Sequence, residues 1–130
     1  MEQLRKNTLL EALGIELIEI SAGKVVATMP VDERTRQPFG VLHGGASVAL
    51  AETVASIGAY ELVDKEKEIV VGLEINANHI RSVRDGKVVA TGTVLHRGRT
   101  TMVWDIKIVD EEGRLVSVSR CTIAVLQKER

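Results

Sequence analysis

A single carboxylate interrupts an apolar segment in the first half of the chain. Residues 44–60 read GGASVALAETVASIGAY, and Glu52 is the only charged residue among them. Burying a carboxylate among apolar side chains costs several kcal/mol unless it is paired, hydrogen-bonded or protonated. Glu52 is therefore either structural, reaching the surface or pairing with an arginine, or it serves as a general base or nucleophile.

Residues that could hold a reacting carbonyl stand directly before this segment. The stretch QPFGVLHGG ends in His43 and the glycine pair Gly44-Gly45. In a helix beginning there, free backbone N–H groups and the positive end of the dipole would stabilise a developing oxyanion. Glycine suits such a position because a side chain would block close approach of a substrate. Taken alone, the glycine pair is equally consistent with flexibility at a helix start, and His43 with a structural histidine.

Other catalytic chemistries find little support in the residue pattern. The three histidines, His43, His79 and His96, lie far apart and form no H-E-x-x-H motif, which argues against a metal site. No G-x-S-x-G motif offers a serine nucleophile, and the glycines match neither a phosphate-binding loop nor a dinucleotide fingerprint. Cys121 lies within an apolar segment and is typical of a small packing residue. We therefore expect neither a metal nor a bound cofactor.

Composition narrows the class of partner. The 130 residues include 17 Lys and Arg against 18 Asp and Glu, so no overall charge attracts nucleic acid or an anionic membrane. The lone cysteine cannot form an internal disulfide, and the N-terminal sequence MEQLRKNTLLEALG lacks a long apolar segment, which favours a cytoplasmic protein. The length predicts one domain spanning residues 1–130.

The elements that must position these residues can be read from the apolar pattern. The 44–60 segment is apolar on nearly every side, which predicts a helix buried all round, and it is too short to span a bilayer. Leu4, Leu9, Leu10 and Leu13, followed by Gly14, predict a short N-terminal helix. Strands are predicted at 15–20, 24–31, 69–82, 87–97, 100–110 and 114–126, with turns that suggest consecutive antiparallel neighbours. Such a sheet must bury one face, and the 44–60 helix is the apolar element available to cover it.

Two sequence motifs, one at the start of the predicted helix and one on the strand that follows it, resemble those of a known family. VLHGGASVALAE at the helix start and VGLEINANHIRS on the following strand are similar to the hotdog-fold acyl-CoA thioesterases. They most resemble the PaaI-like branch, which includes the 1,4-dihydroxy-2-naphthoyl-CoA hydrolases of menaquinone biosynthesis. The resemblance implies an α+β hotdog fold, in which a six-stranded antiparallel sheet wraps around a long central helix.

The resemblance also implies roles for the residues around the helix start. Glu52 would be the catalytic carboxylate, attacking the thioester carbonyl or activating water, and the Gly44 N–H would polarise that carbonyl. Gln37 and His43 would position the thioester, while Ser56 would hydrogen-bond the carboxylate or the water. Coenzyme A would be part of the substrate, bound by residues of two regions: Gly72, His79, Ile80, Arg81, Ser82, His96, Arg97, Gly98, Arg99, Thr100 and Thr101. A charged hairpin tip is otherwise an ordinary solvated turn, so the clusters carry more weight than any one arginine.

Helix geometry adds a requirement. Gly44 and Glu52 are eight residues apart, which is about 12 Å along a helix, so one thioester cannot contact both within one chain. A second subunit related by two-fold symmetry would place Glu52 of one chain opposite Gly44 of the other. The sequence therefore predicts a homodimer with two shared sites, with a tetramer as a further assembly.

Two other functions and the acyl group stay open. A non-catalytic acyl-CoA-binding module would need no carboxylate at this site. A hydroxyacyl-thioester dehydratase would use a histidine such as His43 with a carboxylate from the other subunit. The only aromatic residues are Phe39, Tyr60 and Trp104, so nothing fixes the acyl group. An acyl-carrier protein could also replace CoA as the thiol carrier.

Overall fold

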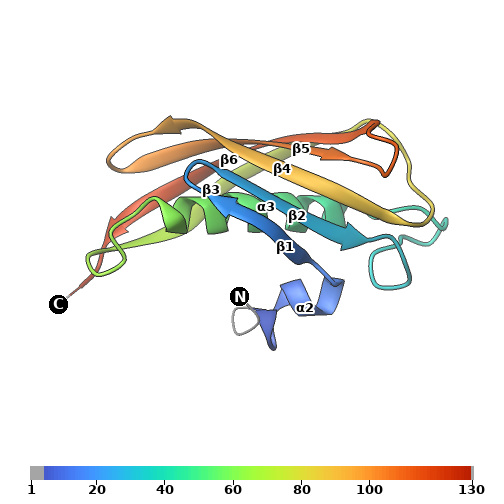
Figure 1. Ribbon diagram of the computed structural model, residues 1–130, viewed down its shortest axis with the longest axis horizontal. Coiled ribbons are helices and arrows are strands. Elements are labelled where there is room, and N and C mark those ends of the chain that lie inside the picture. The colour runs from blue at the N-terminus through green and yellow to red at the C-terminus, as the bar shows by residue number, and fades with distance from the viewer. Residues whose placement is uncertain (1–4, 130) are drawn as a thin grey trace.

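A curved antiparallel sheet wraps around one long helix in the computed structural model, which describes residues 5–129 (Figure 1). The helices are α2 (Leu9–Leu13) and α3 (Gly44–Glu61). The strands are β1 (Glu16–Ser21), β2 (Lys24–Pro30), β3 (Glu68–His79), β4 (Lys87–Arg97), β5 (Thr101–Val109) and β6 (Leu115–Gln127). Their spatial order is β1-β2-β4-β5-β6-β3, and all neighbours are antiparallel. The predicted α+β hotdog architecture is confirmed.

The strand order departs from the expected succession of neighbours. β3 pairs with β6, from Glu68↔Gln127 to His79↔Ser117, and it therefore forms one edge of the sheet. β4 lies between β2 and β5, so the turn at Asp85-Gly86 returns the chain from that edge to the middle of the sheet. The prediction that β3 and β4 are neighbours was wrong. Local turn signals mark where a strand ends, but they do not specify its partner.

The predicted boundaries agree closely with the structure, with one difference that matters. The third strand ends at His79 rather than at residue 82. Beyond it, the N–H groups of Ile80 and Arg81 both point at the Val116 carbonyl, at 2.7 and 3.3 Å, so regular pairing stops there. The N-terminal helix is confirmed over Leu9–Leu13 and ends at Gly14 with φ of 75°. Leu4, part of that prediction, lies outside the described residues.

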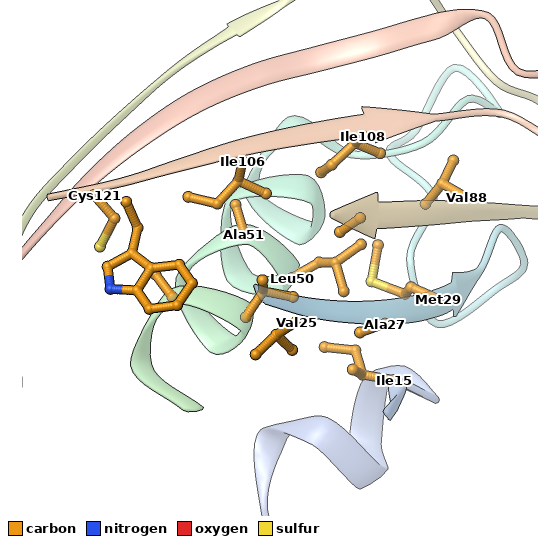
Figure 2. Packing of buried hydrophobic residues seen from close by; sticks show 14 of the residues in the cluster. Ile15, Val25, Ala27, Met29, Leu50, Ala51, Val88, Ile106, Ile108 and Cys121 are labelled. Atoms are coloured by element: carbon orange, nitrogen blue, oxygen red, sulfur yellow. The ribbon is translucent and has the colours of Figure 1, made fainter. Parts of the chain in front are cut away.

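Small residues let α3 sit close to the sheet. A Cβ on Gly58 would lie 2.3 Å from the Trp104 ring, and one on Gly92 would lie 2.4 Å from Val54. Glycine at these two positions is therefore a packing requirement. Figure 2 shows α3 residues such as Leu50 and Ala51 facing apolar side chains of the strands, within a core that is fully buried at both residues.

The opposite face of α3 is open in the single chain. Val48, Ala49, Glu52 and Ile57 are only half-buried, and Tyr60 is exposed. The prediction of a helix buried all round was therefore wrong for one chain, because the sheet covers one side of α3 only. No helix within residues 5–129 is long and apolar enough to cross a membrane.

Candidate active site

The start of α3 presents one unused backbone donor. The His43 Nδ1 atom accepts the Gly45 N–H at 2.7 Å, and the His43 carbonyl accepts the N–H groups of Ala46 and Ser47 at 3.0 and 3.2 Å. These bonds satisfy three of the four N–H groups that open the helix. Across residues 5–129, the Gly44 N–H alone among these four has no acceptor. The predicted polarising group is therefore available to a ligand.

His79 covers Gly44 from the end of β3. A Cβ on Gly44 would lie 2.8 Å from the His79 Nε2 atom, so glycine is needed for the ring to reach this position. Gly44 and His79 line a small pocket of about 190 Å³, here named the Gly44 pocket. Its other walls are Leu42, Ser47, Ile80, Arg81, Ser82 and Val116. The structure thus brings Gly44 together with four of the residues predicted to bind CoA, namely His79, Ile80, Arg81 and Ser82.

Glu52 points from the middle of α3 toward β3. A Cβ on Gly72 would lie 2.5 Å from the Glu52 Oε2 atom, so the missing side chain at Gly72 makes room for the carboxylate. Glu52 is half-buried, and within residues 5–129 it has no hydrogen bond and no ion pair. The structural alternative, in which an arginine neutralises it, is therefore not seen in the described part of the chain.

An apolar groove of about 650 Å³ runs along the open face of α3, with Glu52 in its wall; we name it the Glu52 groove. Ser56 lines the same groove one turn beyond Glu52, but no hydrogen bond joins the two side chains among the described residues. α2 and β1 form the opposite wall, through Leu9, Leu10 and Ile20. No sequence pattern predicted that the N-terminal helix would line this groove, because its leucines are typical of a helix packed on a core.

Cys121 lies beneath the same region and is inert. The thiol is fully buried on β6. Burial, together with the nearby carboxylates of Glu52 and Glu74, raises the pKa of Cys121 to about 11. Because only a thiolate is an effective nucleophile, Cys121 is a packing residue at neutral pH, as predicted.

Gln37 is held by its own loop. Its Oε1 atom accepts the Phe39 N–H, and its carbonyl accepts the Gly40 N–H at 2.9 Å. The side-chain amide NH₂ keeps its donors for a ligand. Gln37 lines neither the Gly44 pocket nor the Glu52 groove, so a single chain does not bring it to Glu52.

The second predicted CoA-binding cluster lies at the far end of α3. Arg97 donates a hydrogen bond to the carbonyl of Leu62, which caps the C-terminus of this helix. The adjoining β4–β5 hairpin, which also contains His96, Gly98, Arg99, Thr100 and Thr101, lies at the opposite end of α3 from the residues that follow β3 (Figure 1). The 18 residues of α3 span about 27 Å, so one chain does not join the two clusters. Arg97 has a capping contact that sequence reasoning did not foresee.

Metal ligands are not grouped in the described part of the chain. Among residues 5–129, no three His, Cys, Asp or Glu side chains lie close enough together to hold an ion. His43 caps α3, His79 covers Gly44 and His96 contacts Gly98. Each histidine therefore has a separate structural contact.

Comparison with known proteins gives a consistent result. Residues 39–117 match the thioesterase superfamily. The chain is 61% identical over 123 residues to ComA2 of Bacillus subtilis, which is named as a candidate esterase, with coverage of 95% of this chain and 98% of that protein. It is 52% identical to a 1,4-dihydroxy-2-naphthoyl-CoA hydrolase of Listeria monocytogenes, over 92% of this chain and 97% of that one. A crystal structure of a mutant thioesterase, PA1618 of Pseudomonas aeruginosa, superposes with a TM-score of 0.95 at 44% identity, covering 98% and 91% of the two chains.

Proposed function

The chain belongs to the thioesterase superfamily, as its two motifs predicted, and we propose that it hydrolyses acyl-CoA to a free acid and CoA with Glu52 as the catalytic carboxylate. One observation carries the assignment of Glu52. Its carboxylate lies in the wall of an apolar groove, against Gly72, without a hydrogen bond or ion pair within residues 5–129. A carboxylate kept unpaired beside apolar space is available to a reacting group.

Two chemical routes use this carboxylate. As a general base, Glu52 removes a proton from water while the water oxygen bonds to the thioester carbon. As a nucleophile, Glu52 itself bonds to that carbon, and water later cleaves the resulting anhydride. In both routes the carbonyl oxygen becomes an oxyanion, the carbon–sulfur bond breaks, and the departing thiolate takes up a proton. The Gly44 N–H stabilises the oxyanion in either case.

The two groups come from different subunits in this proposal. Gly44 and Glu52 are about 12 Å apart along α3, which exceeds the reach of one carbonyl. The edge strand β3 carries the exposed side chains Ile69, Val71 and Leu73, and unpaired edges of this kind associate readily. The open face of α3 lies beside that edge strand. A two-fold axis beside β3 and the open face of α3 would give a homodimer in which each site combines Glu52 of one chain with Gly44 of the other.

The same symmetry would bring the two predicted CoA-binding clusters together, one from the residues that follow β3 and one from the β4–β5 hairpin of the partner. Antiparallel α3 helices bring the C-terminal end of one helix near the N-terminal end of the other. Arg99 on the β4–β5 hairpin of one chain would then approach Arg81 in the Gly44 pocket of its partner. Guanidinium groups of both regions would bind the phosphates of CoA. The names of the relatives favour an aromatic acyl group such as 1,4-dihydroxy-2-naphthoyl.

His43 supports hydrolysis over dehydration. Its Nδ1 atom accepts the Gly45 N–H, so the neutral ring carries its proton on Nε2. A dehydratase would need this histidine as a base, whereas the contact with Gly45 leaves a neutral His43 with an Nε2 proton that it can donate. The same position fits a role in orienting the thioester carbonyl.

A product assay tests the proposal. The protein is incubated with a series of acyl-CoA and 3-hydroxyacyl-CoA thioesters, and released thiol and enoyl thioester are measured in parallel. We expect thiol release without enoyl formation. Enoyl product would indicate the dehydratase, and binding of acyl-CoA by calorimetry with no turnover of any thioester would indicate a binding module.

A further inference from the structure

His79 lies beside the backbone group that is proposed to bind the oxyanion. It is the last residue of β3, and its Nε2 atom lies 2.8 Å from the point where a Cβ on Gly44 would be. The two residues line the Gly44 pocket together, and His79 is otherwise exposed. A ligand bound to the unused Gly44 N–H would therefore meet the Nε2 edge of this ring.

A buried hydroxyl without a partner lies across the sheet from His79. In the pairing of β3 with β6, Ser117 is directly opposite His79. Ser117 is fully buried, and its Oγ atom has no hydrogen-bond partner within residues 5–129. Opposite residues of an antiparallel pair share a face and have Cβ atoms about 4.5–5.5 Å apart, so this hydroxyl is within side-chain reach of the imidazole. An unpaired polar group in the interior calls for such a partner.

We propose that His79 donates a hydrogen bond from Nε2 to the sulfur of the departing thiolate, and that Ser117 positions the ring. The inference rests on the proposed function. The oxygen and the sulfur of a thioester are bonded to the same carbon, so an oxygen held at the Gly44 N–H brings the sulfur close to Nε2. When the carbon–sulfur bond breaks, its electron pair stays on sulfur, and His79 stabilises the charge that develops there. The thiolate then takes up a proton from solvent, and His79 keeps its own.

Ser117 determines which ring nitrogen carries the proton. In a neutral imidazole one nitrogen donates a hydrogen bond and the other accepts one. The Ser117 hydroxyl turns to donate to Nδ1, which leaves the proton on Nε2, the atom that faces Gly44. Ser117 is thus a positioning residue, because it acts on the thioester only through His79.

The test varies the leaving group and keeps the acyl group constant. The acyl group is benzoyl or hexanoyl, whichever the wild type releases faster from CoA. kcat and KM are measured with the acyl-CoA, the acyl-pantetheine and the S-phenyl thioester, whose aryl thiolate leaves readily without assistance. His79→Ala should lower kcat at least about tenfold for the first two substrates and less than about threefold for the third. His79→Gln retains an amide donor and should recover part of the loss.

The serine has a matched control on its own strand. Ser119 is also buried, its Oγ atom is also unpaired within residues 5–129, and it lies opposite Ala77 instead of a histidine. Ser117→Ala should lower kcat about threefold with the same dependence on the leaving group, whereas Ser119→Ala should leave kcat unchanged. In the double variant with His79→Ala, Ser117→Ala should cause no further loss, because its effect passes through that ring.

The remaining outcomes contradict the proposal. Equal losses of kcat on all three substrates would mean that His79 does not act on the leaving group. A higher KM for the acyl-CoA alone would make His79 a nucleotide contact, and equal effects of Ser117→Ala and Ser119→Ala would remove the positioning role. If the wild type releases neither acyl group from CoA, the proposed function fails and this role fails with it. If the wild type is active and His79→Ala, with normal circular dichroism, matches it on every substrate, only the role of His79 fails.

Discussion

The two halves of α3 offer opposite chemistry. At its N-terminus, Gly44 presents an unused backbone N–H beside His79 and Arg81, an environment that attracts negative charge. Two turns later, Glu52 places a carboxylate in the wall of an apolar groove. A straight helix keeps these groups about 12 Å apart, so neither half forms a complete site. In the proposed mechanism, one chain therefore contributes two half-sites: Gly44 would stabilise the oxyanion, and Glu52 would carry out the attack.

Removing the carboxylate should have the largest effect. Glu52→Gln keeps the size of the side chain but cannot act as a base or nucleophile, so kcat should fall at least about a hundredfold. Thiol-release kinetics measure the loss, and Glu19→Gln, an exposed glutamate on β1, is the control. Near wild-type turnover in Glu52→Gln would contradict the assignment of Glu52 as the catalytic carboxylate.

A smaller loss is expected when Glu52 is displaced rather than removed. The methyl group of Gly72→Ala would lie 2.5 Å from the carboxylate and must push it aside. Misplacing a catalytic group by about 1 Å can cost up to about a hundredfold, and we expect at least about tenfold in kcat with little change in KM. Glu74→Ala on the same strand is the control. An unchanged kcat in Gly72→Ala would show that Glu52 does not act from the observed position.

The cationic clusters should affect binding more than chemistry. Neutralising Arg81 should raise KM for an acyl-CoA about threefold to tenfold and leave an acyl-pantetheine nearly unchanged, since only the first has nucleotide phosphates. Arg97→Gln should raise the same KM and also lower the melting temperature, because its guanidinium caps α3 at Leu62. Equal KM changes for both substrates would contradict a phosphate-binding role.

The smallest predicted effect concerns Cys121 and pH. Its pKa is raised from 9.0 to about 11, first by burial and then by Glu52 and Glu74. The folded state therefore holds this proton more tightly than the unfolded state, and the contribution to stability is lost as pH rises from about 9 to about 11. Urea unfolding at both ends of this range should show a smaller pH-dependent loss for Cys121→Ala than for the wild type. The same loss in both proteins would contradict the prediction.

Sequence patterns predicted the elements well because their signals are local. Gly14 and the β-branched runs marked the helix end and the strands within a few residues. The pairing of β3 with β6 could not be predicted in the same way, since it joins residues that are far apart in the sequence, from Glu68 with Gln127 to His79 with Ser117, and such partners depend on the whole sheet. The open face of α3 was also missed, because an apolar helix indicates burial without saying which surface provides it.

The residues of the candidate site could be predicted from their types, but the contacts between them could not. Glu52 was singled out because few roles explain a charged residue within an apolar segment. Gly44 was singled out because it is a glycine at a predicted helix start, where few roles explain a missing side chain. The packing of His79 over Gly44 and of Glu52 against Gly72 depends on the sheet bringing β3 beside α3. No local pattern marks Leu9 as part of the groove, because its role depends on where α2 folds back.

Mixed dimers test the shared site most directly. One parent carries Glu52→Ala, and the other carries Gly44→Pro, which removes the backbone N–H. In the mixed dimer one site collects both changes and the other site collects none. Separately tagged chains, co-expressed and purified as the mixed dimer, should recover up to about half of wild-type turnover, although each parent alone is inactive. No recovery in a correctly folded mixed dimer, verified by mass and circular dichroism, would mean that each site is built within one chain.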